Sequence, residues 1–215
     1  MKTLIPFDDR IEAGIRLGEK LKSEDSPAPG TLVLGLVRGG AVIAKHLAET
    51  AGLEWDILLV RKIGAPRHSE YAVGAYAEFG ELISNKYVLD ELGLDQDWLE
   101  LQQLKAAGEC ERLHRELRGS QPAPKLAGRE IIICDDGMAT GLTMFAAVEA
   151  VKRAGALSVT VAVPVLPPDA LGNLKRRGIV HTYLACPAGF QAVGQFYRDF
   201  TPVTSRQVSE LLTER

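Results

Sequence analysis

Two adjacent carboxylates, Asp135 and Asp136, precede a Thr-Gly-x-Thr turn at residues 140–143. The turn offers hydroxyl and free backbone N–H groups to one anion, and Gly141 permits a tight backbone conformation. A helix that begins directly after the turn adds a dipole that favours negative charge there. Two carboxylates beside such a phosphate site indicate a ligand with phosphate at one end and hydroxyl groups or a chelated divalent cation next to it. Phosphorylated ribose fits that description.

The flanking sequence predicts the elements that hold this loop. Residues 131–134 are apolar without alternation, which is typical of a strand buried on both faces of a parallel sheet, and residues 143–154 have the pattern of a helix. The loop between them therefore lies at the carboxyl edge of the sheet, where α/β proteins bind ligands. An acidic pair on its own would be better explained by a solvated turn or a helix cap. The order of the whole segment favours the ligand site.

The segment from Glu130 to Ala154 resembles the signature of the type I phosphoribosyltransferases, in which a hydrophobic strand leads into two acidic residues and a TGxT phosphate loop. That loop binds phosphoribosyl pyrophosphate (PRPP). The resemblance covers nearly the whole chain and points to a little-characterised branch of the family. It implies that Asp135 and Asp136 are the catalytic carboxylates, which hold the ribose hydroxyls and, through water, Mg²⁺. It also implies that the ribose and the 5′-phosphate contact the loop residues Gly137, Met138, Ala139, Thr140, Gly141 and Thr143.

Two other predicted strand ends carry groups that could bind an anion. Two glycines in Arg38-Gly39-Gly40 let the backbone approach an anion closely, and Arg38 adds a bidentate cationic fork. Arg61 and Lys62 follow the next predicted strand. The family resemblance implies that both segments bind pyrophosphate. The residues alone are also consistent with a plain turn in the first case and a solvated strand end in the second.

The resemblance further implies a flexible loop that closes over the reacting centre and shields it from water. Arg67, His68, Glu70 and Tyr71 lie on or beside that loop.

Three aromatic residues near the C-terminus are candidates for an acceptor pocket, because a flat base can stack on their rings. They are Phe190, Phe196 and Tyr197. The same spacing is also typical of a core cap beneath a C-terminal helix. Enzymes of the family that act on hypoxanthine and guanine carry an acidic residue immediately before the TGxT threonine, where it serves as a base. Here that position is Ala139, so we expect an acceptor other than a 6-oxopurine.

Strand and helix signals alternate along the chain, without repeats or low-complexity tracts. The predicted helices are residues 10–21, 41–51, 97–117, 143–154 and 205–212, and the predicted strands are residues 31–37, 55–61, 131–134, 157–163 and 182–186. Residues 71–78 and 82–88 predict a hairpin. We therefore expect an α/β fold with a doubly wound, mostly parallel sheet of the type I phosphoribosyltransferase kind, a small hood and a flexible loop, in a single domain of residues 1–215.

Composition agrees with a globular domain, since 46% of the 215 residues are hydrophobic and 25% are charged. A net charge of −3 provides no overall attraction to nucleic acid or to anionic membranes. No apolar run approaches the roughly 20 residues of a membrane span, and the first ten residues are too polar for a secretory signal. The three cysteines are widely spaced, which favours reduced thiols over a zinc site. We expect a cytoplasmic homodimer.

The sequence thus predicts a Mg²⁺-dependent phosphoribosyltransferase that transfers ribose 5-phosphate from PRPP to a small nitrogen acceptor, such as a nucleobase, and releases pyrophosphate. Two alternatives stay open. One is a regulatory protein that retains the site as a sensor of PRPP or nucleotides. The other is a hydrolase of PRPP or of a phosphorylated nucleoside.

Overall fold

The structure is a computed structural model that describes residues 7–24, 27–66, 68–80, 82–84 and 86–214, except for the side chains of residues 68–72. Its centre is a five-stranded parallel sheet with the strand order β2-β1-β6-β7-β8. The strands are β1 (Leu32–Leu36), β2 (Glu54–Leu58), β6 (Glu130–Cys134), β7 (Ser158–Val165) and β8 (Val180–Ala185). This is the doubly wound parallel sheet that the sequence predicts.

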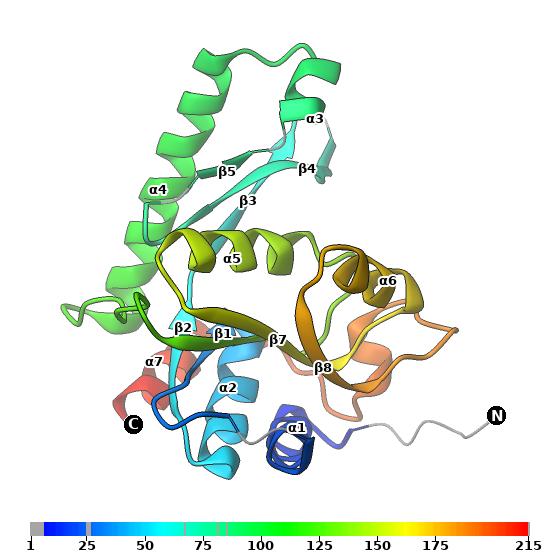
Figure 1. Ribbon diagram of the computed structural model, residues 1–215. Helices are drawn as coiled ribbons and strands as arrows, with labels where there is room; N and C mark the ends of the chain where they lie inside the picture. Colours follow the sequence, from blue (N-terminus) through cyan, green and yellow to red (C-terminus); the bar gives the residue numbers. More distant parts are fainter. Residues whose placement is uncertain (1–6, 25–26, 67, 81, 85, 215) are drawn as a thin grey trace.

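Helices cover both faces of this sheet (Figure 1). One face packs against α1 (Arg10–Glu24), α2 (Gly39–Ala51) and α7 (Ser205–Thr213), and the other against α5 (Leu142–Arg153) and α6 (Pro168–Arg176). Side chains alternate accordingly along β1. Val33 belongs to the apolar cluster of α1 and α2, whereas Leu32 and Leu34 belong to the cluster of α5 and α6. Burial on both faces explains why these strands are apolar without alternation.

A smaller antiparallel sheet forms the hood above α5 (Figure 1). It consists of β3 (Val60–Ala65), β4 (His68–Ala77) and β5 (Leu82–Ser84), followed by α3 (Lys86–Glu91) and the long α4 (Gln96–Arg118). A separate small core includes Val73 of β4, Leu89 of α3 and Leu99 of α4. The predicted hairpin is therefore confirmed as β4 and β5, although its second strand ends at Ser84 and residues 86–88 are helical.

The prediction of one strand over residues 55–61 is wrong, because the chain leaves the parallel sheet after Leu58 and enters the hood at Val60. The residue between the two strands, Leu59, exchanges hydrogen bonds with the end of the hood hairpin. Its N–H donates to the Glu78 carboxylate (3.1 Å) and its carbonyl accepts the Glu78 N–H (3.0 Å). This contact with a distant residue divides an apolar run that looks continuous in the sequence.

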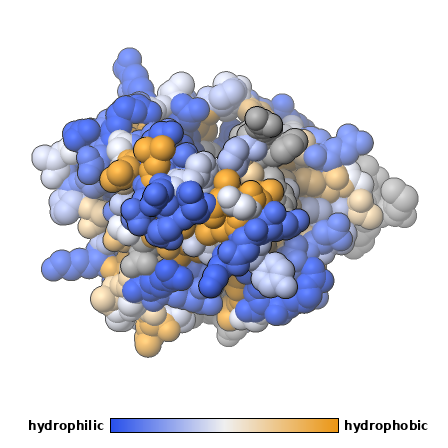
Figure 2. All heavy atoms as spheres, turned by 90° about the horizontal axis from the view of Figure 1, so that it is seen from above, coloured by the Kyte–Doolittle hydropathy of each residue, from blue (hydrophilic) through white to orange (hydrophobic). Residues whose placement is uncertain are grey.

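The surface of the hood is mostly hydrophilic. Seen from above, hydrophobic side chains form separate patches among hydrophilic ones (Figure 2). The large apolar side chains exposed on α3 and α4 are Tyr87, Leu101 and Leu104. Single exposed apolar residues are ordinary on folded proteins. None of the helices formed by the described residues combines the length and the apolar composition that a membrane span requires.

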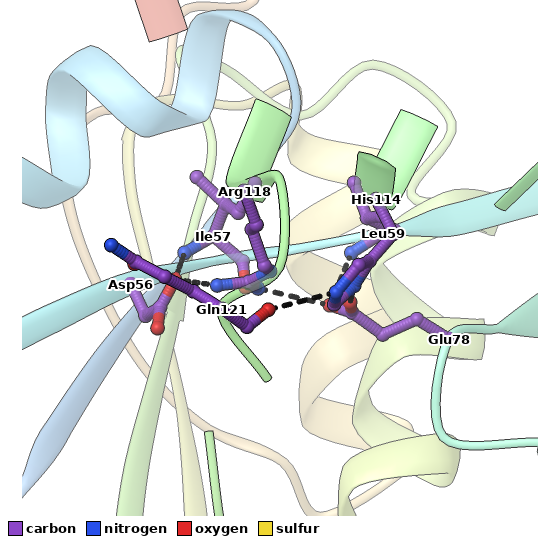
Figure 3. Close-up of polar contacts among 7 residues, drawn as sticks. All are labelled: Asp56, Ile57, Leu59, Glu78, His114, Arg118 and Gln121. Carbon is purple, nitrogen blue, oxygen red and sulfur yellow. Dashed lines mark hydrogen bonds and ion pairs between the residues drawn. The ribbon is translucent and has the colours of Figure 1, made fainter. Parts of the chain in front are cut away.

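Buried charges join the hood to the parallel sheet (Figure 3). Arg118, at the end of α4, pairs with Asp56 of β2 and lies 3.3 Å from the Glu78 carboxylate. The side chains of these three residues are 0%, 5% and 3% exposed, so water does not screen the pairs. Arg118 also donates to the Ile57 carbonyl (2.7 Å), and His114 approaches Glu78 at 3.4 Å. One guanidinium thus connects α4, β2 and the end of β4.

Replacing Arg118 should strongly destabilise the fold. In Arg118→Met, Asp56 and Glu78 stay buried without their cation, which typically costs about 3–5 kcal/mol. The matched control is Arg112→Met on the same helix, because Arg112 forms an ion pair with Glu116 in which the two side chains are 63% and 39% exposed. Its loss should change stability by less than about 0.5 kcal/mol. Urea unfolding measures both variants, and equal losses would contradict the role given to Arg118.

Candidate functional site

The loops that follow β1 and β6 meet at the point where the winding of the sheet reverses. β1 and β6 are neighbours in register, with Gly35 opposite Cys134. The chain continues from β1 into α2 on one face and from β6 into α5 on the other. Loops that separate in this way leave a crevice at the carboxyl edge of the sheet, where α/β proteins bind ligands. The Arg38-Gly39-Gly40 segment and the acidic loop lie side by side at this crevice.

The approach of these two loops leaves no room for a side chain on either glycine. A Cβ atom built on Gly39 would overlap the Asp136 carboxylate. One built on Gly40 would lie 2.8 Å from the Cys134 carbonyl oxygen and 3.1 Å from Asp135 Oδ1. The two glycines also form the first turn of α2, so the helix begins two residues earlier than predicted. In this first turn the Gly40 N–H donates to the Asp135 carboxylate and the Ala41 N–H to the Arg38 carbonyl (3.2 Å). The positive end of the helix dipole favours negative charge at the crevice.

The loop at residues 138–143 is anchored on both sides and open between its anchors. Met138 is buried, and its N–H donates to the Val165 carbonyl at the end of β7 (2.9 Å). Gly141 caps α5 with a φ of 80°, and a Cβ there would overlap the Met138 side chain. Ala139 and Thr140, between these anchors, are exposed. The middle of the loop, with the Thr140 hydroxyl, is therefore open to solvent at the start of α5, and an anion could bind there.

The two carboxylates hold protons more tightly than solvated aspartates. Burial raises the pKa of Asp135 well above 3.8, and the adjacent Asp136 raises it further, against hydrogen bonds from the backbone N–H groups of Asp136 and Gly40. Burial likewise raises the pKa of Asp136, although the hydrogen bond and the positive charge of Arg10 oppose this rise. Two like charges are thus held together at a buried edge. A bound cation or hydroxyl donors would relieve their repulsion.

Arg10 is part of the site and was missed in the sequence analysis. Its Nε donates to Asp136 Oδ2 at 2.8 Å, and the two side chains are 10% and 15% exposed. Arg10 begins α1, 126 positions before its partner. No local sequence pattern marks an arginine for such a long-range contact, so only the fold reveals it.

The C-terminal tail forms a wall of the acidic loop. Tyr197 is buried, and its hydroxyl donates to the Asp136 carbonyl at 2.5 Å. Burial raises the pKa of Tyr197, so the hydroxyl stays protonated. Phe196 is buried in the core, and Phe190, which is half-buried, stacks on it with 5.3 Å between ring centres. Protein covers the rings of Phe196 and Tyr197, so among the three aromatic candidates Phe190 alone has an accessible face.

The structure does not bring Arg61 to the two loops. Arg61 lies on β3 in the hood, and its Nε is 3.4 Å from the Glu109 carboxylate of α4. Lys62 is the next residue of the strand and therefore points to the opposite face. Of the residues expected at the flexible loop, Arg67 lies outside the described residues, as do the side chains of His68, Glu70 and Tyr71.

The residues at the crevice suit a divalent cation only together with a ligand. Carboxylate oxygens are the donors that Mg²⁺ prefers, and Asp135 and Asp136 supply them. In the part of the chain that the structure describes, no group of three or more His, Cys, Asp or Glu residues could hold a metal ion. Mg²⁺ is often bound by one or two carboxylates plus the phosphates of a substrate. The donor set fits that mode of binding.

Comparison with known proteins identifies relatives of this chain. Residues 11–177 match the family model of the phosphoribosyl transferase domain. A protein of Mycobacterium tuberculosis (strain H37Rv), provisionally named a phosphoribosyl transferase, is 36% identical over 206 residues, which are 96% of this chain and 46% of that protein. The chain thus spans about half the length of the curated relatives it matches.

Two solved structures share the fold. The crystal structure of TT1426 from Thermus thermophilus is 40% identical with a TM-score of 0.87, and the match covers 97% of this chain and 98% of that one. A hypothetical protein from Neisseria gonorrhoeae, crystallised with bound ppGpp, is 14% identical with a TM-score of 0.52 over 100% and 99% of the two chains. At that identity the second match shows the fold alone.

The raised pKa of Asp135 predicts a pH-dependent gain in stability for Asp135→Asn, since the amide oxygen accepts the same backbone bonds without the charge. Near pH 4, close to the pKa of an unfolded aspartate, the two proteins should be about equally stable. As the pH rises, the unfolded chain loses its proton before the folded one, so the wild type loses stability relative to the variant. We therefore expect Asp135→Asn to be more stable than the wild type at pH 8, and the difference to shrink towards pH 4. Urea unfolding across this pH range checks it, with the exposed Asp90→Asn as control. A difference independent of pH would contradict the assigned pKa direction.

Proposed function

Since this chain belongs to the phosphoribosyltransferase domain family, we propose that it binds PRPP with Mg²⁺ and transfers ribose 5-phosphate to a nitrogen acceptor, such as a nucleobase, releasing pyrophosphate. The observation that carries the proposal is the contact between two loops of different chemistry. One holds two carboxylates and a phosphate loop, and the other is a glycine-rich helix start that lies against those carboxylates. PRPP carries phosphate at both ends of a ribose, so it would occupy both loops at once.

Each part of PRPP has a complementary set of residues. The loop from Met138 to Thr143 would hold the 5′-phosphate through its hydroxyl groups and the N–H groups at the start of α5. Asp135 and Asp136 would accept hydrogen bonds from the ribose hydroxyls. The segment Arg38-Gly39-Gly40 would hold the pyrophosphate, with a contribution from Lys62.

The same residues would stabilise the transition state. When the bond between ribose and pyrophosphate breaks, negative charge grows on the leaving group, and the positive end of α2 together with Arg38 would stabilise it. Mg²⁺, when bound with the ligand, would neutralise part of that charge. The carboxylates would orient the ribose and favour the positive charge that develops on it. No covalent nucleophile is required.

Binding of PRPP with Mg²⁺ is the first test of this proposal. Asp135→Asn/Asp136→Asn should weaken binding at least tenfold in calorimetry, about 1.4 kcal/mol, because the ribose hydroxyls lose their charged acceptors. The control is Asp90→Asn/Asp97→Asn, which removes two exposed carboxylates in the hood and should leave affinity unchanged. Equal affinity in wild type and in the site variant would contradict the placement of the ribose.

The acceptor provides a second test. Because Ala139 stands where the purine enzymes of the family carry an acidic base, the acceptor must already present a nucleophilic nitrogen or lose its proton easily. Hypoxanthine and guanine should release no pyrophosphate from saturating PRPP, whereas some other nucleobase or small amine in a screen should do so. Turnover with either 6-oxopurine would refute this argument. Failure of every acceptor, together with salt-sensitive binding of RNA or DNA, would favour a regulatory protein instead.

A further inference from the structure

Arg10 connects three segments that are far apart in the sequence. It begins α1, its Nε donates to the Asp136 carboxylate, and its Nη1 donates to the Thr201 carbonyl at 2.9 Å. Its guanidinium carbon lies 3.9 Å from the centre of the Phe200 ring. A planar guanidinium stacked on an aromatic ring has few orientations open to it. The cation is therefore fixed in place before any ligand arrives.

Asp136 is held at both its backbone and its side chain. Tyr197 donates to its carbonyl, and Arg10 donates to Oδ2 of its carboxylate. Both donors come from segments that are themselves joined, because Phe7 pairs with the tail through two backbone hydrogen bonds of 2.8 Å, from the Phe7 N–H to the Phe196 carbonyl and from the Arg198 N–H to the Phe7 carbonyl. The start of α1 and the tail before α7 thus meet at Asp136.

Arg10 also lies beside the loop assigned to pyrophosphate. A Cβ built on Gly39 would be 3.1 Å from Arg10 Nε, so the guanidinium lies where the acidic loop and the glycine loop meet. A ligand that spans both loops brings several negative charges towards two carboxylates, and a fixed positive charge at the junction would offset that repulsion. The position suits a residue that acts on ligand binding through Asp136.

We propose that Arg10 is a positioning residue for PRPP: it fixes the Asp136 carboxylate in the orientation that receives the ribose hydroxyls. The role rests on the proposed function. The hydrogen bond from Arg10 Nε to Oδ2 and the hydrogen bond from Tyr197 to the Asp136 carbonyl hold the carboxylate in a single geometry in the free protein. Without Arg10, Asp136 must be oriented on binding and its repulsion with Asp135 is uncompensated, so binding energy is lost.

The test compares Arg10→Met, which keeps the length of the side chain and its contact with Phe200, with Arg10→Lys, which restores the charge. Calorimetry measures the affinity of each protein for PRPP with Mg²⁺, for ribose 5-phosphate and for inorganic phosphate. We expect Arg10→Met to weaken the binding of PRPP and ribose 5-phosphate at least tenfold. The binding of inorganic phosphate should weaken less than twofold, because free phosphate needs only the loop at residues 138–143. Arg10→Lys should bind PRPP at least threefold more tightly than Arg10→Met. The control is Arg198→Gln, which removes the exposed ion pair between Arg198 and Asp8, close to Arg10. It should leave all three affinities unchanged.

Each outcome decides a separate question. Equal PRPP affinity in wild type and Arg10→Met would refute the positioning role and leave the proposed function intact. Parallel losses of ribose 5-phosphate and inorganic phosphate would also refute it, because they would indicate general distortion of the loop. Wild-type protein that binds no PRPP would contradict the proposed function and this role together. If Arg10→Met does not fold, the test uses Phe200→Leu, which removes the ring that orients the guanidinium. This variant should bind ribose 5-phosphate at least threefold more weakly than the wild type, and an unchanged affinity would refute the role.

Discussion

The close approach of the Gly39 backbone to the Asp136 carboxylate is the constraint on which the rest of the site depends. No side chain fits between them, so the start of α2 and the acidic loop after β6 form one continuous surface. The strand order makes this possible, because β1 and β6 are adjacent while the helices that follow them cover opposite faces. The glycine-rich start of α2 and the two carboxylates thereby lie directly against each other.

Buried arginines connect distant parts of this fold at two places. Arg118 joins α4 and the hood to β2, and Arg10 joins the start of α1 and the tail to the acidic loop. Buried ion pairs contribute little net stability in comparison with well-packed apolar residues, but they demand one geometry. Here Arg118 joins the hood to the sheet, and Arg10 holds the Asp136 carboxylate. Both are arrangements that the proposed transfer of ribose 5-phosphate requires.

Local sequence signals predicted much of this structure. The apolar run before Asp135 and the glycine that caps α5 are features of neighbouring residues, and the predicted strand and helix agree with β6 and α5 to within one residue at each end. Non-local contacts account for the errors. The strand predicted over residues 55–61 ends at Leu58, and Leu59 pairs with the distant Glu78 instead of continuing the parallel sheet. Arg10 acts on a carboxylate 126 positions away, which no pattern within α1 can indicate.

The central claim is that one ligand occupies both loops. A crystal structure of the protein with PRPP and Mg²⁺ tests it most directly. We predict the 5′-phosphate at residues 138–143, the ribose hydroxyls within hydrogen-bond distance of Asp135 and Asp136, and the pyrophosphate against Gly39 and Gly40. A ligand bound by the phosphate loop alone, with its pyrophosphate directed away from the start of α2, would contradict the account.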